Sequence, residues 1–318
     1  MYCSMMYRSI LTCLLITVST ALFAQTFTYA PINIPGAVAT EARGINNNGE
    51  VVGFYYTTKS CTEPTGEVQF PNCIVHGFKM VNGTIIKLMV PNSMSTAILG
   101  VNDYGDLVGF TILNDGSAHA FLWLHTNVVK LLNAAGAGGN SDEHTVAFGV
   151  NKALTVVGGL WFYSTPQGSG GWVWQNGTFT TMNPGDTVSG TCCWSVNGIS
   201  NNGFLSGTNF YNDFVSAWFK SATDEDFYPL TKDTNGTAVN SNSDVIGYSV
   251  SGKGWFAKSI ESNEGTNDAT EAKPAFISVA YPNSKATYPM GLNDKRWIAG
   301  VYTDSSGVMH GFIAKPNF

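Results

Sequence analysis

Carboxylate, histidine and aromatic side chains that could do chemistry lie close together in the middle of the chain. Asp142, Glu143 and His144 are consecutive, and aromatic residues that include Trp161, Tyr163 and Trp194 follow before position 200. Aromatic rings beside carboxylates are suited to sugar binding, through apolar ring stacking and a few directed hydrogen bonds. The alternative interpretation is that the rings fill the core and the carboxylates are solvated. The predicted ligand-binding set comprises Asp142, Glu143, His144, Trp161, Tyr163 and Trp194.

A second group of polar residues recurs at one position of a repeated unit. A ring of six such groups could bind an ion, but a short amide or hydroxyl at the entrance of a turn is well explained by bonds to nearby backbone N–H groups. We therefore predict a structural role for this group. It comprises Asn46, Asn102, Asn151, Ser200, Asn240 and Asn293.

Known catalytic and metal-binding motifs are absent from the sequence. There is no phosphate-binding loop, no Gly-x-Ser-x-Gly elbow and no His-Glu-x-x-His pair. Three histidines, His76, His119 and His310, belong to different repeats and cannot easily converge on one metal. The sequence therefore predicts no catalytic residue, no metal and no cofactor.

The repeated unit that must position these residues is ten residues long and begins at Gly44. Each copy has an apolar residue after its first position, a polar centre and an apolar pair before its last position, which is the pattern of a β-hairpin. Asn48-Gly49 supplies the positive-φ preference of a tight turn, but copies without this Gly predict the turn less clearly. The copies begin at Gly44, Gly100, Gly149, Gly198, Ala238 and Gly291.

A second motif, a small residue before a large aromatic, follows every hairpin and predicts a third strand. An apolar run after it predicts a fourth. Four strands per unit is the pattern of a β-propeller blade, so the sequence predicts an all-β, six-bladed propeller of antiparallel blades. An open β-solenoid is the alternative. The second motif begins at His76, His119, Gly170, Ser216, Lys253 and His310.

The last repeat lacks a fourth strand, and the chain carries an unassigned extra strand at 27–34. Pro35 precedes Gly44 by nine residues, as Pro91 precedes Gly100 and Pro282 precedes Gly291. Thr40 matches Thr96 and Thr287 within this spacing. The extra strand is therefore predicted to be a displaced fourth strand that completes the last blade and closes the ring.

Residues 1–24 read as a secretory signal peptide, which leaves 25–318 as a single domain. Arg8 gives the positive charge, 10–18 form the apolar core, and cleavage is predicted after Ala24. An uncleaved membrane anchor is the alternative, although the apolar run is shorter than the roughly 20 residues that span a bilayer. No later segment is long enough. We expect a secreted or periplasmic protein.

Charge and cysteines agree with export and argue against nucleic acid as a partner. Without Arg8 the chain has 15 basic and 22 acidic side chains, a net charge of −7, and no cluster of Lys or Arg. Four cysteines remain after the signal. Proximity predicts a disulfide between Cys61 and Cys73, worth about 3 kcal/mol in the loop-entropy model, and Cys192 and Cys193 could form a vicinal disulfide.

The two motifs together resemble the bacterial extracellular repeat family named for its His-Ala-Phe tripeptide, the HAF repeat. The tripeptide begins at His119 and recurs with a central Gly at His76 and His310. The resemblance implies a secreted bacterial protein of the Gram-negative type and no particular activity. Three copies replace the His, with Gly170, Ser216 and Lys253.

The expected function is that of a secreted, non-catalytic binding or scaffold propeller. We expect a monomer that recognises a glycan or a cell-surface protein through the face where the strand 2–3 and strand 4–1 loops emerge. The alternative is a secreted polysaccharide lyase or glycosidase. It would need Asp142, Glu143 or His144 in a pocket with a second carboxylate about 5 to 10 Å away.

Overall fold

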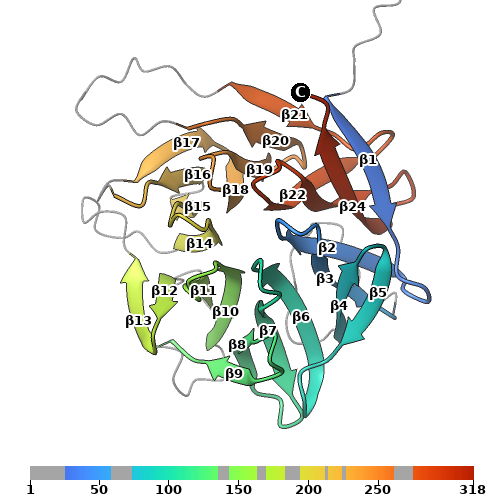
Figure 1. The fold of residues 1–318 in the computed structure, drawn as a ribbon. Coiled ribbons are helices and arrows are strands. Elements are labelled where there is room, and N and C mark those ends of the chain that lie inside the picture. The colour runs from blue at the N-terminus through green and yellow to red at the C-terminus, as the bar shows by residue number, and fades with distance from the viewer. Residues whose placement is uncertain are drawn as a thin grey trace, which may run out of the picture.

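The computed structural model describes residues 26–58, 74–134, 143–162, 170–182, 194–211, 214–223, 227–260 and 275–318. Twenty-four strands in these ranges form six four-stranded antiparallel sheets, which surround a central axis like the blades of a propeller (Figure 1). The predicted six-bladed fold is therefore confirmed, and the open solenoid is excluded. Residues 1–24, which the sequence predicts to be a signal peptide, and Cys61, Cys73, Cys192 and Cys193 lie outside the described residues.

Each blade is a meander whose first strand lies nearest the axis. The first three blades contain β2(Ala39–Ile45), β3(Val51–Tyr56), β4(Val75–Val81) and β5(Thr84–Leu88), then β6(Ser93–Val101), β7(Leu107–Leu113), β8(Ala118–Trp123) and β9(Val129–Leu132), then β10(Glu143–Val150), β11(Val156–Phe162), β12(Gly171–Gln175) and β13(Thr178–Met182). The last three contain β14(Trp194–Ile199), β15(Leu205–Tyr211), β16(Phe214–Lys220) and β17(Tyr228–Lys232), then β18(Thr234–Val239), β19(Val245–Ser249), β20(Gly254–Ala257) and β21(Phe276–Val279), then β22(Ala286–Leu292), β23(Ile298–Thr303), β24(Met309–Pro316) and β1(Phe27–Ile32).

The sixth blade is completed by β1, as the sequence predicts. β1 pairs with β24 from Phe27 opposite Pro316 to Ile32 opposite Gly311. The Phe27 side chain is fully buried and contacts the rings of Phe256 and Phe318. The N-terminal strand thus fills the outer position of a blade whose other strands come from the end of the chain (Figure 1).

Threonine contacts explain the shared Pro and Thr spacing that links β1 to other fourth strands. The Thr40 hydroxyl accepts a hydrogen bond from the Ile34 backbone N–H at 3.3 Å. Thr96 and Thr287 accept the equivalent bonds from Val90 and Tyr281. Each threonine therefore fixes the connection that leads from one blade into the next.

Every inner strand carries a β-bulge just before the first position of the ten-residue repeat. A bulge re-aims one side chain and bends its strand. The repeat's first glycine lies where neighbouring inner strands come closest: a Cβ on Gly100 would lie 2.7 Å from the Phe148 carbonyl oxygen of the next blade. The glycine therefore allows the inner strands to meet around the axis.

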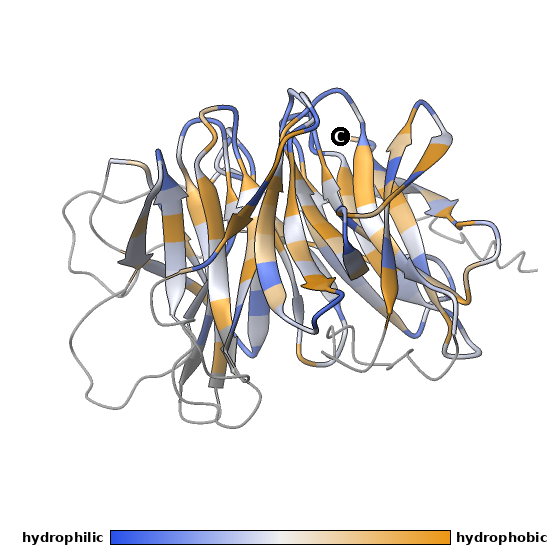
Figure 2. Cartoon of the chain, turned by 90° about the horizontal axis from the view of Figure 1, so that it is seen from below, coloured by the Kyte–Doolittle hydropathy of each residue, from blue (hydrophilic) through white to orange (hydrophobic). Residues whose placement is uncertain are grey.

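Buried apolar residues form one cluster between each pair of neighbouring blades. A seventh cluster joins residues of blades 1, 2, 3 and 6, among them Phe54, Leu99, Val146 and Met290. Seen from the side, the apolar residues follow the strands, whereas the tight turns at the edge that holds the C-terminus are mostly hydrophilic (Figure 2). The core is thus a set of inter-blade layers around the axis.

The two faces of the disc differ in their connections. We call the face with the strand 1–2 and strand 3–4 connections the turn face, and the opposite face the loop face. All six strand 1–2 connections span five residues, such as 46–50 and 102–106, whereas the strand 3–4 connections of the same face range from two residues, 82–83, to eighteen, 258–275. The strand 2–3 connections on the loop face range from two residues, 212–213, to eighteen, 57–74.

Candidate functional site

The turn face is built from six copies of one turn. In the first copy the backbone N–H of Gly49 donates to the Asn46 carbonyl, and that of Asn46 donates to the Glu50 carbonyl. The fourth residue has positive φ in all six copies, even where it is Leu154, Ser243 or Arg296. The turn therefore has the same form in every copy, including those that lack the glycine and whose turn the sequence predicts less clearly. The positive φ falls on this fourth residue and not on the Asn before it.

The recurring asparagines bond to their own turns, as predicted. Asn46 Oδ1 accepts from the backbone N–H groups of Asn48 and Glu50, at 3.1 and 2.9 Å. Asn240 accepts from the equivalent groups of its own turn. These bonds satisfy the backbone donors of the turn.

The same asparagines also join neighbouring blades, which the sequence analysis missed. Each Nδ2 donates to the backbone carbonyl at the equivalent position of the next blade, and these bonds form what we call the asparagine belt. The bonds run from Asn46 to Asn102 (2.9 Å), Asn102 to Asn151 (3.1 Å), Asn151 to Ser200 (3.3 Å), Asn240 to Asn293 (3.1 Å) and Asn293 to Asn46 (2.9 Å).

The seam between blades 4 and 5 is bridged differently, because Ser200 replaces the asparagine. The Ser200 hydroxyl accepts from the Phe204 N–H at 2.9 Å, which keeps the turn bond. Asn202 Nδ2 donates to the Ser241 carbonyl at 3.1 Å and so replaces the bond between blades. Serine therefore retains one of the two roles of the asparagine.

Graded substitution of Asn102 is expected to separate these two roles. Asn102→Ser should keep the turn bond but lose the bond to blade 3, at a cost of about 1 kcal/mol. Asn102→Ala should lose both and leave buried partners unpaired, at a cost of about 2–4 kcal/mol. Urea unfolding measures both changes. No loss of stability in Asn102→Ser would show that the bond between blades contributes nothing, and equal losses in the two variants would show the same of the turn bond.

Charged and amide side chains form a second layer above the belt. Asn47 Nδ2 donates to Asp103 at 3.0 Å and to Asp294 at 2.8 Å, and Lys152 Nζ lies 3.0 Å from Asp103. Burial alone would raise the pKa of Asp103, but hydrogen bonds from Asn47 and Lys152 lower it overall. Within the described ranges, no group of three or more Asp, Glu, His or Cys residues could hold a metal ion.

A buried acid connects the belt to the outer strands of blade 2. Asp106 accepts from Asn102 Nδ2 at 2.8 Å and from the backbone N–H of His125 at 2.8 Å, while His125 Nδ1 lies 2.7 Å from its Oδ1. Burial alone would raise the pKa of Asp106, but these bonds lower it overall. Asp106 is therefore a structural carboxylate.

Acid is expected to weaken the fold partly through Asp106. Because its folded pKa lies below its unfolded value, the ionised carboxylate stabilises the fold above the unfolded pKa, and this contribution is lost as the pH falls through the folded pKa. Asp106→Asn should therefore flatten the fall in unfolding free energy between about pH 5 and pH 2. Urea unfolding across that range measures it. An unchanged slope would contradict the assignment.

The histidines of the third strands tie together two connections on the loop face. His119 Nδ1 lies 2.7 Å from Asn133 Oδ1, and its Nε2 lies 2.9 Å from Ser117 Oγ. His310 makes the same pair of contacts, with Asn33 and Asp304. Both ring nitrogens of each histidine therefore make structural contacts.

The candidate ligand set falls at the loop-face ends of blades 3 and 4. Glu143 and His144 begin β10, where they pair with Phe162 and Trp161 of β11. His144 is buried, and only the backbone of Glu143 and Trp161 is described. Asp142 and Tyr163 lie outside the described residues.

Trp194, the last of the set, packs inside a blade interface. Its ring lies 6.4 Å from that of Trp218 and 6.1 Å from that of Phe227. It belongs to the apolar cluster between blades 3 and 4. Trp194 is half-buried in this position, and its role in ligand binding stays a prediction.

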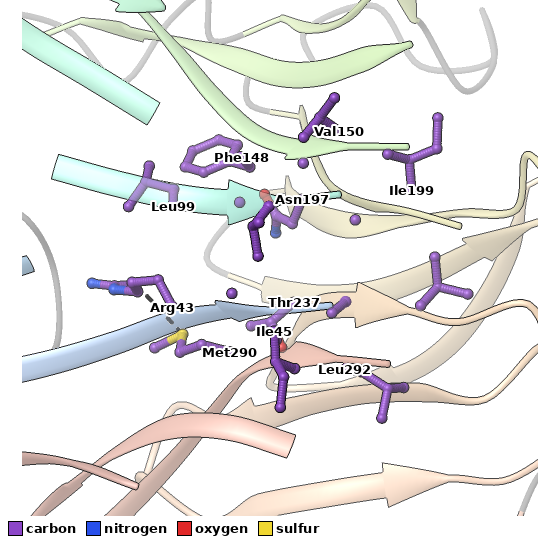
Figure 3. A pocket seen from close by; sticks show the side chains of 18 residues that line it. Arg43, Ile45, Leu99, Phe148, Val150, Asn197, Ile199, Thr237, Met290 and Leu292 are labelled. Atoms are coloured by element: carbon purple, nitrogen blue, oxygen red, sulfur yellow. Dashed lines mark hydrogen bonds between the residues drawn. The ribbon is translucent and has the colours of Figure 1, made fainter. Parts of the chain in front are cut away.

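A cavity of about 60 Å³ lies on the axis, inside the ring of inner strands. Three residues of each inner strand line it, and the bulged residue of each contributes a side chain (Figure 3). These six side chains do not recur in type. They are Arg43, Leu99, Phe148, Asn197, Thr237 and Met290.

No family model and no curated protein sequence matches this chain. Solved structures similar to it include YCF48 from Cyanidioschyzon merolae (TM-score 0.45, 10% identity, 91% of this chain and 96% of that one). Another is a fungal lectin from Aleuria aurantia, described as a six-bladed β-propeller with a novel fucose recognition mode (0.47, 10%, 89% and 93%). AofleA from Arthrobotrys oligospora is a third (0.44, 9%, 92% and 84%). The six blades are assigned from the strand pairing of this chain itself.

None of the residues described by the structure belongs to a helix long and apolar enough to cross a bilayer.

Proposed function

We propose that this chain is a secreted or periplasmic, non-catalytic binding module that holds a glycan or a cell-surface protein on its loop face. The observation that carries the proposal is the contrast between the two faces. The strand 1–2 connections of the turn face all span five residues and repeat one turn, whereas the strand 2–3 connections of the loop face differ in length from blade to blade. Binding residues are disproportionately found on variable loops held by a rigid scaffold.

The contacts of the recurring polar residues support this division. The asparagines join blades, Asp103 and Asp106 are held by several hydrogen bonds each, and His119 and His310 use both ring nitrogens in structural contacts. Groups committed in this way are poor candidates for ligand recognition. The non-recurring loop residues are the better ones, and the HAF-repeat resemblance agrees with export of the protein.

The glycan form of the proposal is tested on a glycan array with three proteins. One is the chain without residues 1–24, and the second replaces residues 57–74 by the four-residue connection Asn114–Ser117 of blade 2. The control is Tyr104→Ala, which removes a 60% exposed aromatic side chain from the turn face. We expect glycan binding by the first protein, at least tenfold weaker binding by the loop variant and unchanged binding by the control.

Three results would count against this proposal. Loss of binding in Tyr104→Ala but not in the loop variant would place the site on the turn face instead of the loop face. Binding to neither glycans nor bacterial cell surfaces would reject both forms of the proposal. Release of new sugar ends from a bound polysaccharide would show an enzyme instead.

A further inference from the structure

One blade places a pair of charged residues at the propeller axis, where the other blades place none. In the inner strands, the equivalents of Arg43 are the uncharged residues Leu99, Phe148, Asn197, Thr237 and Met290. Two positions earlier lies Glu41, whose equivalents are Ala97, Val146, Ser195, Asn235 and Tyr288. The pair therefore does not belong to the repeated architecture.

The pair is held inside an apolar cluster. Arg43 Nη2 lies 2.5 Å from Glu41 Oε2, and the Tyr56 hydroxyl donates to Glu41 Oε1 at 2.8 Å. Glu41 is fully buried, and the Arg43 guanidinium lies 5.3 Å from the ring centre of Phe54. Removing two charges from water costs free energy that their attraction often fails to recover. A structural reason for the pair is therefore weak.

At the wall of the cavity, the Arg43 guanidinium donates to a weak hydrogen-bond acceptor. Arg43 Nη1 donates to the thioether sulfur of Met290 at 3.4 Å, and both residues line the cavity (Figure 3). Sulfur is a weak hydrogen-bond acceptor, whereas a carboxylate oxygen forms a short, charge-assisted bond with guanidinium. An anion that displaces the sulfur would therefore improve the contact.

Exposure indicates the side from which such an anion would enter. Ser195, Asn197 and Thr237 are half-buried, whereas the asparagines of the belt are buried. The belt and the charged layer above it cover the turn-face end of the axis. The axial cavity is therefore more open toward the loop face, along blades 4 and 5.

We propose that the axial channel binds a small carboxylate, with Arg43 as its anion ligand. The cavity of about 60 Å³ is larger than the roughly 10–15 Å³ that one water molecule needs, so the site has room for an acetate-sized anion or the carboxylate tip of a larger ligand. Asn197 and Thr237 line the same cavity, but Asn197 Nδ2 donates to Gly236 and Thr208 and the Thr237 hydroxyl donates to Pro289, so the charged contact to the anion comes from Arg43. The site is separate from the binding surface proposed for the loops, and either can fail alone.

Arginine NMR tests the site directly, because the chain without its signal has two arginines, Arg43 and Arg296. The protein is labelled with ¹⁵N-arginine and titrated with sodium acetate at constant ionic strength. We expect saturable shifts of the Arg43 side-chain N–H signals. Arg296, which is paired with Asp244 at 2.8 Å, should not move. Acetamide, the neutral analogue of acetate, should shift neither residue.

A paired substitution gives the matched comparison. Glu41→Gln/Arg43→Met removes both charges together, keeps an acceptor for Tyr56 and uses the residue that blade 6 has at the same position. Lys87→Met removes a positive charge outside the channel. Calorimetric titration should show acetate affinity reduced at least tenfold by the first variant and unchanged by the second.

Glucuronate distinguishes a free acid from the carboxylate of a sugar. If both acetate and glucuronate shift Arg43, the site accepts the tip of an acidic sugar; if acetate alone does, it accepts a free small acid. Absence of saturable Arg43 shifts with either anion in the wild-type protein would overturn the proposal, even if the double variant does not fold. Equal acetate affinity in wild type and a folded double variant would also overturn it.

Discussion

Gly109→Ala is expected to destabilise the propeller by more than about 4 kcal/mol. Gly109 is the last glycine of the second repeat and lies opposite the bulge of β6. A Cβ at this position would lie 1.9 Å from the Ala97 carbonyl oxygen, which is backbone and cannot rotate away. Relieving this clash would require β6 to move. β6 leads directly into Asn102 of the belt and forms part of the wall of the axial cavity.

Gly170→Ala is the matched control. A Cβ on Gly170 meets nothing closer than the Thr181 methyl group at 3.7 Å, an ordinary contact. Its stability should stay within about 0.5 kcal/mol of wild type. Urea unfolding at neutral pH measures both variants. If Gly109→Ala unfolds at the wild-type urea concentration, then the bulge does not fix the β6–β7 pairing as the structure has it.

Deletion of residues 26–34 is expected to abolish cooperative folding. The segment contains β1 and buries Phe27, Ile32 and Ile34 in two different inter-blade clusters. At about 1.5–3 kcal/mol for each large apolar side chain, their burial alone approaches the total stability of a typical domain, about 5–15 kcal/mol. The edge of β24 would also lose its partner strand.

Calorimetry of the deletion variant should show no single sharp transition. A synthetic peptide of residues 26–34 should restore the transition as its concentration rises, because binding to the folded state alone stabilises that state by mass action. Phe27→Ala provides a milder comparison, with an expected loss of about 3–5 kcal/mol. An unchanged melting temperature in the deletion variant would contradict ring closure by β1.

Much of the fold could be predicted because the same backbone requirement recurs in every blade. The first and last glycines of the repeat mark close backbone approaches, and the aromatic after the small residue fills an inter-blade layer. The shared distance from Pro35 to Gly44, with Thr40 between them, identified β1 as a fourth strand. These signals are local and periodic, so the sequence alone revealed them.

The bonds of the belt could not be predicted in the same way. The acceptor for Asn46 is the backbone carbonyl of Asn102, which becomes its neighbour only when two blades pack around the axis. The axial site was missed because the bulges that direct Arg43 to the axis are not visible in the sequence pattern. A charged residue at a repeat position that is otherwise uncharged was the available signal.

Of the predicted loop-face set, Trp194 has a structural environment that sequence spacing did not reveal. An aromatic near the start of an inner strand can face a ligand or pack within the propeller, and Trp194 lies beside Trp218 of its own blade and against the cluster between blades 3 and 4. Asp142 and Tyr163, with the disulfide between Cys61 and Cys73 and the Cys192–Cys193 pair, lie outside the described residues. They stay predictions.

The asparagine belt also bears on how the number of blades is set. Each of the five asparagines gives one hydrogen bond to the next blade, and the bond from Asn202 to Ser241 spans the remaining seam. Such a link has the same form in a ring of five, six or seven members, so the belt can close a ring of any of these sizes. The number six must be set by the angle at which neighbouring blades pack. That angle depends on the side-chain volumes of the inter-blade clusters and on the contact distances at the glycines of the inner strands. The stability of the ring and the number of its blades are thus controlled by different residues of the same repeat.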